Sequence, residues 1–177
     1  VVFSYHIPEK DIIPHAAGLH SVRQICLRPE VMAFLFSSLL MLFAHGVYYT
    51  FFSIYLVEHD YDKGFVGWLW AIGVMCEIGI FFLMPWLMQC FSLKHILMFS
   101  FLCATLRFVL IGQCIEWPVV IVFAQILHAV TYGAHHVSAM MVIHHFFRGR
   151  HQATGQAIYT CMAYGIGGAL GAVSSGY

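Results

Sequence analysis

The stretch VMAFLFSSLLMLFAHGVYYTFFSIYLV, residues 31–57, decides the fold of this protein. It contains no Asp, Glu, Lys, Arg or Pro, and a helix needs roughly 20 mainly apolar residues to cross the hydrocarbon of a bilayer. Further apolar stretches of sufficient length follow at residues 65–88, 93–115, 119–147 and 153–176. The sequence therefore predicts an all-α membrane protein, a helical bundle with five transmembrane helices.

The composition of the whole chain also indicates a membrane protein. Of its 177 residues, 61% are hydrophobic and 9% are charged, which is not the composition of a soluble enzyme. Eight Lys and Arg balance eight Asp and Glu, so the chain has no excess positive charge with which to bind nucleic acid. The six cysteines and twelve histidines lack the spacing of zinc sites or of membrane di-iron centres. We therefore expect no enzymatic activity, no metal and no cofactor.

Residues 1–30 are rich in proline and polar residues, and no apolar stretch among them is long enough to span a membrane. They are predicted to form a polar loop, in which residues 21–27 are either a short helix on the membrane surface or a plain linker. Residues 31–177 then form the transmembrane bundle. Lysine and arginine are enriched in cytoplasmic loops, so we expect residues 1–30 to be cytoplasmic, which leaves only Lys63 outside. The basic residues on the inner side are then Lys10, Arg23, Arg28, Lys94, Arg148 and Arg150.

Small residues recur at every fourth position of the last predicted helix, at Ala163, Gly167, Gly171 and Ser175. Such a stripe lets two helix backbones approach closely in lipid, and it predicts tight packing of this helix against a neighbour. The glycines around it do not form a nucleotide-binding loop, because Leu170 stands where the third glycine of GxGxxG is required.

Two ionisable residues lie far inside predicted spans, Glu77 in the second and Arg107 in the third. A charged side chain at the bilayer centre costs about 2.5 to 3.5 kcal/mol, so such residues usually face a cavity or a partner. With the rise of an α-helix, both lie about 12 to 18 Å below the outer ends of their helices. They are predicted either to form a structural ion pair with each other or to line a functional site.

Other polar side chains share this depth. The fourth span carries Gln125, His128, Tyr132 and His135 at i, i+3, i+7 and i+10, which is one face of a helix. His45 of the first span lies at the level of His128. Aromatic residues stand near them in the first and second spans: Tyr48, Tyr49 and Trp70. Convergence of these groups from several helices predicts a pathway or a binding pocket in the middle of the membrane.

Several motifs relate the chain to a known family. They are HGVYYTFFSIYL at residues 45–56, GWLWA at 67–71 followed by Glu77, FRGRHQ at 147–152, and GQA at 155–157. From about residue 28 to its end, the chain resembles the phenylpropionate permease branch of the major facilitator superfamily. The resemblance implies two six-helix bundles around a central cavity. This chain would supply the central loop and helices 7 to 11, which belong to the carboxyl-terminal half.

The resemblance also implies a location and partners. Members of this branch are multi-pass proteins of the bacterial inner membrane. The expected partners are therefore the lipid bilayer, a small-molecule substrate and the amino-terminal six-helix bundle of the full-length protein. One departure from the superfamily concerns the loop at residues 89–94, which keeps only Lys94 of the usual basic loop motif. The resemblance therefore does not extend to gating through that loop.

Roles for the mid-membrane residues follow from the same resemblance. In lactose permease, a distant relative, a glutamate on helix 8, an arginine on helix 9 and a histidine on helix 10 carry proton coupling and substrate binding. Glu77, Arg107 and His128 lie on the similar helices here, so proton coupling is expected of them. The residues expected to bind substrate are His45, Tyr48, Tyr49, Trp70, Gln125, Tyr132 and Arg107.

The predicted function is secondary active transport by proton-coupled symport of a small organic solute. The resemblance implies an aromatic carboxylate such as phenylpropionate. A sugar or nucleoside proton symporter is the alternative within the same class. A non-transporting membrane protein, such as a haem carrier or receptor, is the alternative of another class, because His45 and His128 on two helices suit haem ligation.

The chain begins with Val1 and ends in an apolar stretch at Tyr177, and we expect it to be an internal fragment. Half of a two-bundle cavity leaves Glu77 and Arg107 facing lipid or another chain. Residues 1–177 reconstituted alone into vesicles with a proton gradient should therefore show no substrate-specific uptake. Proton-dependent uptake by these residues alone would contradict this expectation.

Overall fold

The computed structural model describes residues 17–174 and residue 176, and every regular element within them is helical. A short helix, α1 (Ala17–Cys26), precedes three long ones. These are α2 (Pro29–Glu58), α3 (Lys63–Cys90) and α4 (Leu93–Gln113).

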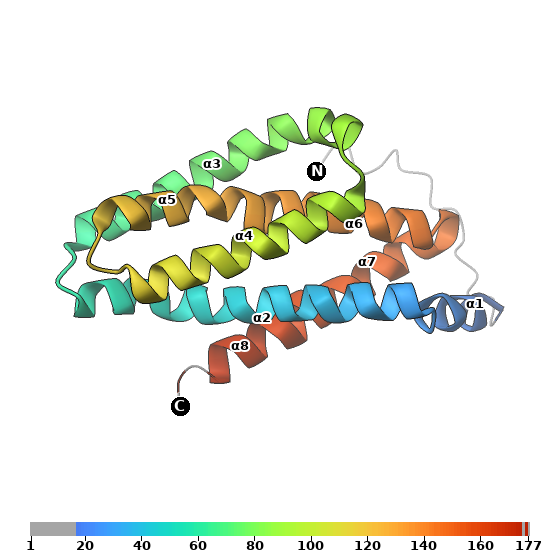
Figure 1. The fold of residues 1–177 in the computed structure, drawn as a ribbon. Helices are drawn as coiled ribbons and strands as arrows, with labels where there is room; N and C mark the ends of the chain where they lie inside the picture. Colours follow the sequence, from blue (N-terminus) through green and yellow to red (C-terminus); the bar gives the residue numbers. More distant parts are fainter. Residues whose placement is uncertain (1–16, 175, 177) are drawn as a thin grey trace, which may run out of the picture.

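The two remaining rods each contain a π-helical segment. The fourth long rod consists of α5 (Pro118–His128), the π-helical η2 (Ala129–Ala134) and α6 (His135–Phe146). The fifth consists of the 3-10 turn η3 (Gly149–His151), α7 (Gln152–Thr160), the π-helical η4 (Cys161–Gly168) and α8 (Ala169–Ser174). Five helical rods of the described chain are thus long and apolar enough to cross a membrane. The predicted all-α bundle with five spans is confirmed (Figure 1).

The predicted polar loop lies only partly within the described residues, since residues 1–16 fall outside them. Residues 17–26 form α1, so most of residues 21–27 are helical and the helix begins earlier than expected, while its position on the membrane surface stays a prediction. α1 is followed almost at once by α2, whose first residue is Pro29. Proline suits this position because the first residues of a helix have no intrahelical use for their N–H groups.

Short polar turns begin the next helices. Asp62 caps α3 by accepting hydrogen bonds from the backbone N–H groups of Gly64 and Phe65, at 2.7 and 3.3 Å, as favoured N-cap residues do. Ser92 takes the same position before α4. These two side chains therefore mark where α3 and α4 start.

The helices pack in two groups. α2 packs chiefly against η4 and α8, whereas α3 and α4 pack against α5 and η2. In Figure 1, α2 and α8 lie on one side of the bundle and α3 on the other, with α4 and α5 between them. α2 and α5 contact each other through side chains such as Tyr48 and Gln125.

Glycines allow the close contact of α2 with η4 and α8. A Cβ atom at Gly167 would lie 2.6 Å from the Leu39 carbonyl oxygen. At Gly171 it would clash with the carbonyl oxygen of Phe43, and at Gly46 of α2 with that of Gly168. The small-residue stripe predicted from the sequence is confirmed at Gly167 and Gly171, while Ser175 lies outside the described residues. Close approach of two backbones is the usual use of such residues in lipid.

The variant Gly167→Ala tests this contact. The new methyl group meets a carbonyl oxygen of α2, and overpacking of this kind costs about 1 to 3 kcal/mol, so the thermal unfolding temperature of the detergent-purified protein should fall. Gly168→Ala is the matched control, because a Cβ there meets nothing within 4 Å and alanine favours the helix. Equal unfolding temperatures for the two variants would contradict the role of Gly167.

Candidate functional site

A layer of buried polar side chains crosses the bundle between two apolar clusters. One cluster lies at the predicted outer end, around Leu56, Leu69 and Ile121, and the other lies toward the predicted inner end, around Leu35 and Ile143. A buried polar group that lacks a partner is costly, so the connections within this layer matter for stability. Its buried polar residues are His45, Arg107, Gln125, His128 and Thr131, whereas the buried Ser38, Ser100, His135 and Ser138 lie among residues of the inner cluster.

Arg107 of α4 is fully buried in this layer. Its Nε donates a hydrogen bond to the Ala124 carbonyl oxygen of α5 at 3.0 Å. Its Cζ lies 4.0 Å from the centre of the Tyr48 ring of α2, which is the geometry of a cation–π contact. Both terminal nitrogens, Nη1 and Nη2, lack a hydrogen-bond partner within the described residues. Glu77 therefore does not bond to Arg107, and the predicted structural ion pair is absent from this conformation of the described chain.

Two tyrosines of α2 join the polar layer to an aromatic cluster. The Tyr48 hydroxyl donates to Gln125 Oε1 at 2.8 Å, and the Tyr49 hydroxyl lies 3.3 Å from His128 Nε2. Trp70 of α3 packs against both tyrosine rings, with centroid distances of 5.1 and 5.8 Å. Four of the residues predicted to bind substrate therefore lie together with His128 in the seam between α2, α3 and α5.

The protonation of His45 follows from its neighbours. His45 Nδ1 lies 2.9 Å from the Met41 carbonyl oxygen, and a carbonyl oxygen only accepts, so Nδ1 carries a hydrogen. The other nitrogen, Nε2, lies 3.5 Å from Thr131 Oγ1. The His45 and His128 rings are 5.7 Å apart. With both nitrogens of His45 directed at protein groups, this conformation offers no free ligand position for haem on that residue.

Glu77 lies near Tyr49 of this network but is not hydrogen-bonded to Arg107. It is half-buried on α3, and its Cγ lies 3.1 Å from the point where a Cβ would stand at Gly133 of η2. Glycine at that point lets η2 approach the Glu77 side chain. Glu77 and Arg107 thus contact different neighbours, Gly133 for the one and Ala124 for the other.

The polar face predicted along the fourth span is interrupted by η2. Tyr132 stacks on His128 at 5.4 Å, as a single face requires, but His135 packs against Phe101 of α4 at 5.5 Å. His136 follows Tyr132 instead, with its ring parallel at 6.5 Å. A π-helix holds more residues per turn than an α-helix, so the residues after it are rotated about the axis. The prediction that His135 shares the face of His128 and Tyr132 is wrong for this reason.

Two further residues, Thr131 and Tyr164, complete the network, and no pattern in the sequence singled them out. The Thr131 hydroxyl donates to the His128 carbonyl oxygen at 3.2 Å. The Tyr164 hydroxyl of η4 lies 2.8 Å from His136 Nδ1, and the Tyr164 ring lies 6.4 Å from that of Tyr132. Tyr164 lies next to the stripe of small residues in the sequence, and only the fold places it beside His136 and Tyr132.

Some residues of the network are fully buried, and others are exposed on the surface of the bundle. Arg107 and Gln125 have no exposed surface, whereas 43% of Tyr49 is exposed. Trp70 and Tyr132 are half-buried. A ligand that approaches this side of the bundle therefore meets aromatic rings first, and reaches the guanidinium group only if those rings move.

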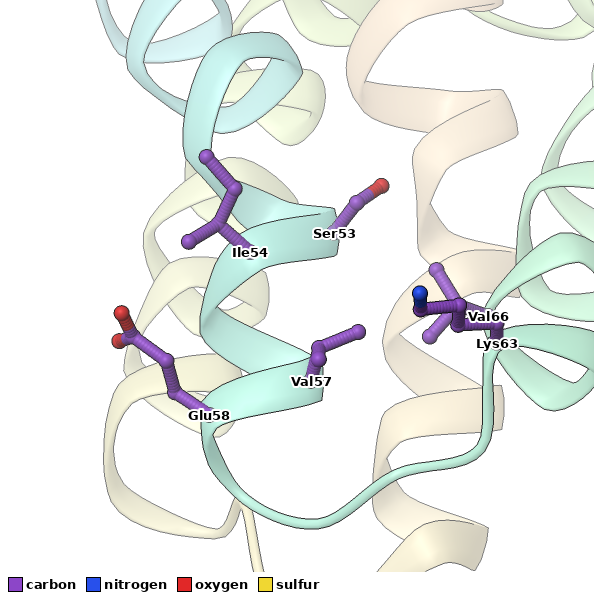
Figure 2. Close-up of a pocket in the computed structure, with 6 residues that line it drawn as sticks. All are labelled: Ser53, Ile54, Val57, Glu58, Lys63 and Val66. Atoms are coloured by element: carbon purple, nitrogen blue, oxygen red, sulfur yellow. The ribbon is translucent and has the colours of Figure 1, made fainter.

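A groove of about 420 Å³ lies between the ends of α2 and α3 at the predicted outer face. Its lining residues are Ser53, Ile54, Val57, Glu58, Lys63 and Val66. Figure 2 shows Ser53 and Val57 directed from α2 toward Lys63 and Val66. The Ser53 hydroxyl oxygen accepts a hydrogen bond from Trp70 Nε1 at 2.9 Å. One residue that lines this groove, Ser53, is therefore hydrogen-bonded to the tryptophan of the aromatic cluster.

Comparison with known proteins identifies relatives of the chain. Residues 5–177 match the model of the MFS_1 like family. The chain is also 34% identical over 134 residues to an Escherichia coli (strain K12) protein named "Probable 3-phenylpropionic acid transporter". That match covers 76% of this chain and 35% of the relative, so it spans much less than the relative's full length. No solved structure matches the chain.

The variant Tyr48→Phe tests the link between the aromatic cluster and the polar layer. It keeps the ring beside Arg107 but leaves Gln125 Oε1 without its donor, which costs about 1 to 3 kcal/mol for a buried group. The unfolding temperature in detergent should fall. Tyr55→Phe on the same helix is the control, because the Tyr55 ring contacts His59 outside the network. A loss of stability in Tyr55→Phe as large as in Tyr48→Phe would count against the link.

Proposed function

We propose that this chain, which belongs to the MFS_1 like family of the major facilitator superfamily, is part of a secondary active transporter that moves a small aromatic carboxylate together with a proton. In this proposal the chain supplies helices 7 to 11 of a bacterial inner-membrane protein. An amino-terminal bundle of the full-length protein faces the exposed aromatic side of the seam. Rocking of two bundles about a mid-membrane site is the usual transport cycle of such folds.

The observation that carries the proposal is the state of Arg107. Its guanidinium group is fully buried and its two terminal nitrogens are unpaired within the described residues. A buried charge without a counter-charge is strongly unfavourable. A carboxylate accepts two parallel hydrogen bonds from a guanidinium group, so a carboxylate substrate would satisfy both nitrogens at once.

The surroundings of Arg107 favour an aromatic acid over other anions. Tyr48, Tyr49 and Trp70 form a continuous aromatic surface beside the guanidinium group. Stacked or edge-to-face contacts with such rings stabilise a bound phenyl group. The name of the Escherichia coli relative, a probable 3-phenylpropionic acid transporter, supports the same substrate class.

Proton coupling is assigned to Glu77, with Arg107 as the group that modulates it. The carboxyl group is half-buried beside Gly133 and is not bonded to Arg107 in this conformation. The proton affinity of a carboxyl group changes with its distance from a cation. A movement of α3 relative to α4 would therefore bind and release a proton during the cycle. His128, with its ring beside Tyr49, is assigned to substrate binding.

Uptake by cells that carry the full-length gene tests the substrate class. Labelled 3-phenylpropionate should accumulate against its gradient and should be lost when the proton gradient is collapsed. Accumulation of a labelled sugar or nucleoside instead would favour the alternative symporters. Absence of uptake of all three substrates, with the protein present in the membrane, would contradict transport of these classes. A visible haem absorption band of the purified protein would favour the haem-carrier alternative.

Two variants separate the proposed roles within the site. Glu77→Gln should abolish uphill accumulation but permit exchange of labelled for unlabelled substrate, because the amide cannot carry the proton. His128→Gln should chiefly raise the substrate concentration needed for half-maximal uptake. Accumulation that persists in Glu77→Gln and is lost in His128→Gln would require the two roles to be exchanged.

A further inference from the structure

A second polar cavity lies far from the aromatic cluster, at the end of the bundle predicted to face the cytoplasm. Its volume is about 370 Å³. It lies where the end of α1, the start of α2 and the turn from α6 to η3 meet. Its lining residues are Ile25, Arg28, His145, Phe146, Arg148 and His151.

Most of this lining is basic, and none of it is acidic. Arg28 and Arg148 contribute two permanent positive charges, and His145 and His151 add further donors. Arg148 is held in place by a hydrogen bond from its Nε to the His145 carbonyl oxygen at 3.2 Å. The nearest acidic residue in the sequence, Glu30, lies in the first turn of α2 and does not line the cavity. The cavity is therefore suited to an anion.

The backbone of α2 adds to this character. Arg28 is its N-cap and makes no side-chain hydrogen bond to the first turn. Helix N-termini carry a partial positive charge and favour anions. The carboxyl end of α6 carries a partial negative charge, which would repel an anion. One of its carbonyl oxygens, that of His145, accepts a hydrogen bond from the positively charged Arg148 side chain. The positive side chains therefore determine the sign of the charge in the cavity.

We propose that this cavity binds the phosphate of an anionic phospholipid in the cytoplasmic leaflet. It lies at the ends of membrane-spanning helices, and Ile25 and Phe146 give it an apolar wall beside the basic groups. Basic pockets between transmembrane helices on this side of a membrane are a common form of lipid headgroup site. The proposal depends on the predicted orientation and is independent of the transported substrate.

Native mass spectrometry of the full-length, delipidated protein tests the proposal, with phosphatidylglycerol, phosphatidylcholine and inorganic phosphate as separate probes. Phosphatidylglycerol should be retained in preference to phosphatidylcholine. The double variant Arg28→Gln with Arg148→Gln should bind phosphatidylglycerol about 30-fold more weakly, as expected for the loss of two basic groups at a membrane surface. The matched control, Arg23→Gln with Lys94→Gln, removes the same charge from exposed positions outside the cavity and should retain the lipid.

Several results would overturn the proposal. One is unchanged binding of phosphatidylglycerol in the double variant, and another is an equal loss in the control, which would indicate diffuse attraction. Binding of inorganic phosphate without any preference for phosphatidylglycerol would identify a free anion as the ligand. Should the double variant fail to fold, Arg28→Lys with Arg148→Lys keeps the charge and should keep most of the binding. A wild-type protein that does not prefer phosphatidylglycerol over phosphatidylcholine refutes the proposal without any variant.

Discussion

A guanidinium group enclosed at the centre of an apolar bundle is the constraint on which the site depends. Arg107 cannot reach water, so three helices supply its environment: the Ala124 carbonyl oxygen from α5, the Tyr48 ring from α2 and its own position on α4. Because each of these contacts is short, the spacing of the three helices is fixed at this depth. The Tyr48 hydroxyl in turn donates a hydrogen bond to Gln125. This bond holds α2 and α5 in register across the seam.

The glycine contacts of α2 complement this arrangement. They bring α2 against η4 and α8 on the side away from α5, and the aromatic side chains then occupy the seam that remains. α2 thus contacts η4 and α8 through backbone atoms and α5 through aromatic side chains. These two interfaces of α2 differ in how much they can change. A boundary between backbones tolerates little change in spacing, whereas a boundary of aromatic rings can change by rotation of side chains.

The sequence predicted the membrane-spanning helices correctly, and it predicted the depth at which several polar residues lie. Hydropathy and charged turns located all five rods, and the spacing of small residues located the close packing of the last one. Helical rise alone brought His45 and His128 to one level, and the structure brings their rings to 5.7 Å. The helical rise gives the depth of a residue in the membrane but not the direction in which its side chain points around the helix axis. Glu77 and Arg107 therefore lie at similar depths without bonding to each other. Tyr164 and Thr131 depend on tertiary packing, and no local pattern marks them.

The π-helical segment η2 has a consequence for the comparison of relatives. A π-helical segment of this kind amounts to one residue inserted into an α-helix, and each α-helical residue turns the chain by about 100°. In a relative that lacks one residue within positions 129–134, the residue that an alignment without a gap pairs with His135 would therefore lie where His136 meets Tyr164. Alignments across this segment need a one-residue gap, or equivalent side chains will be paired with neighbours on another face.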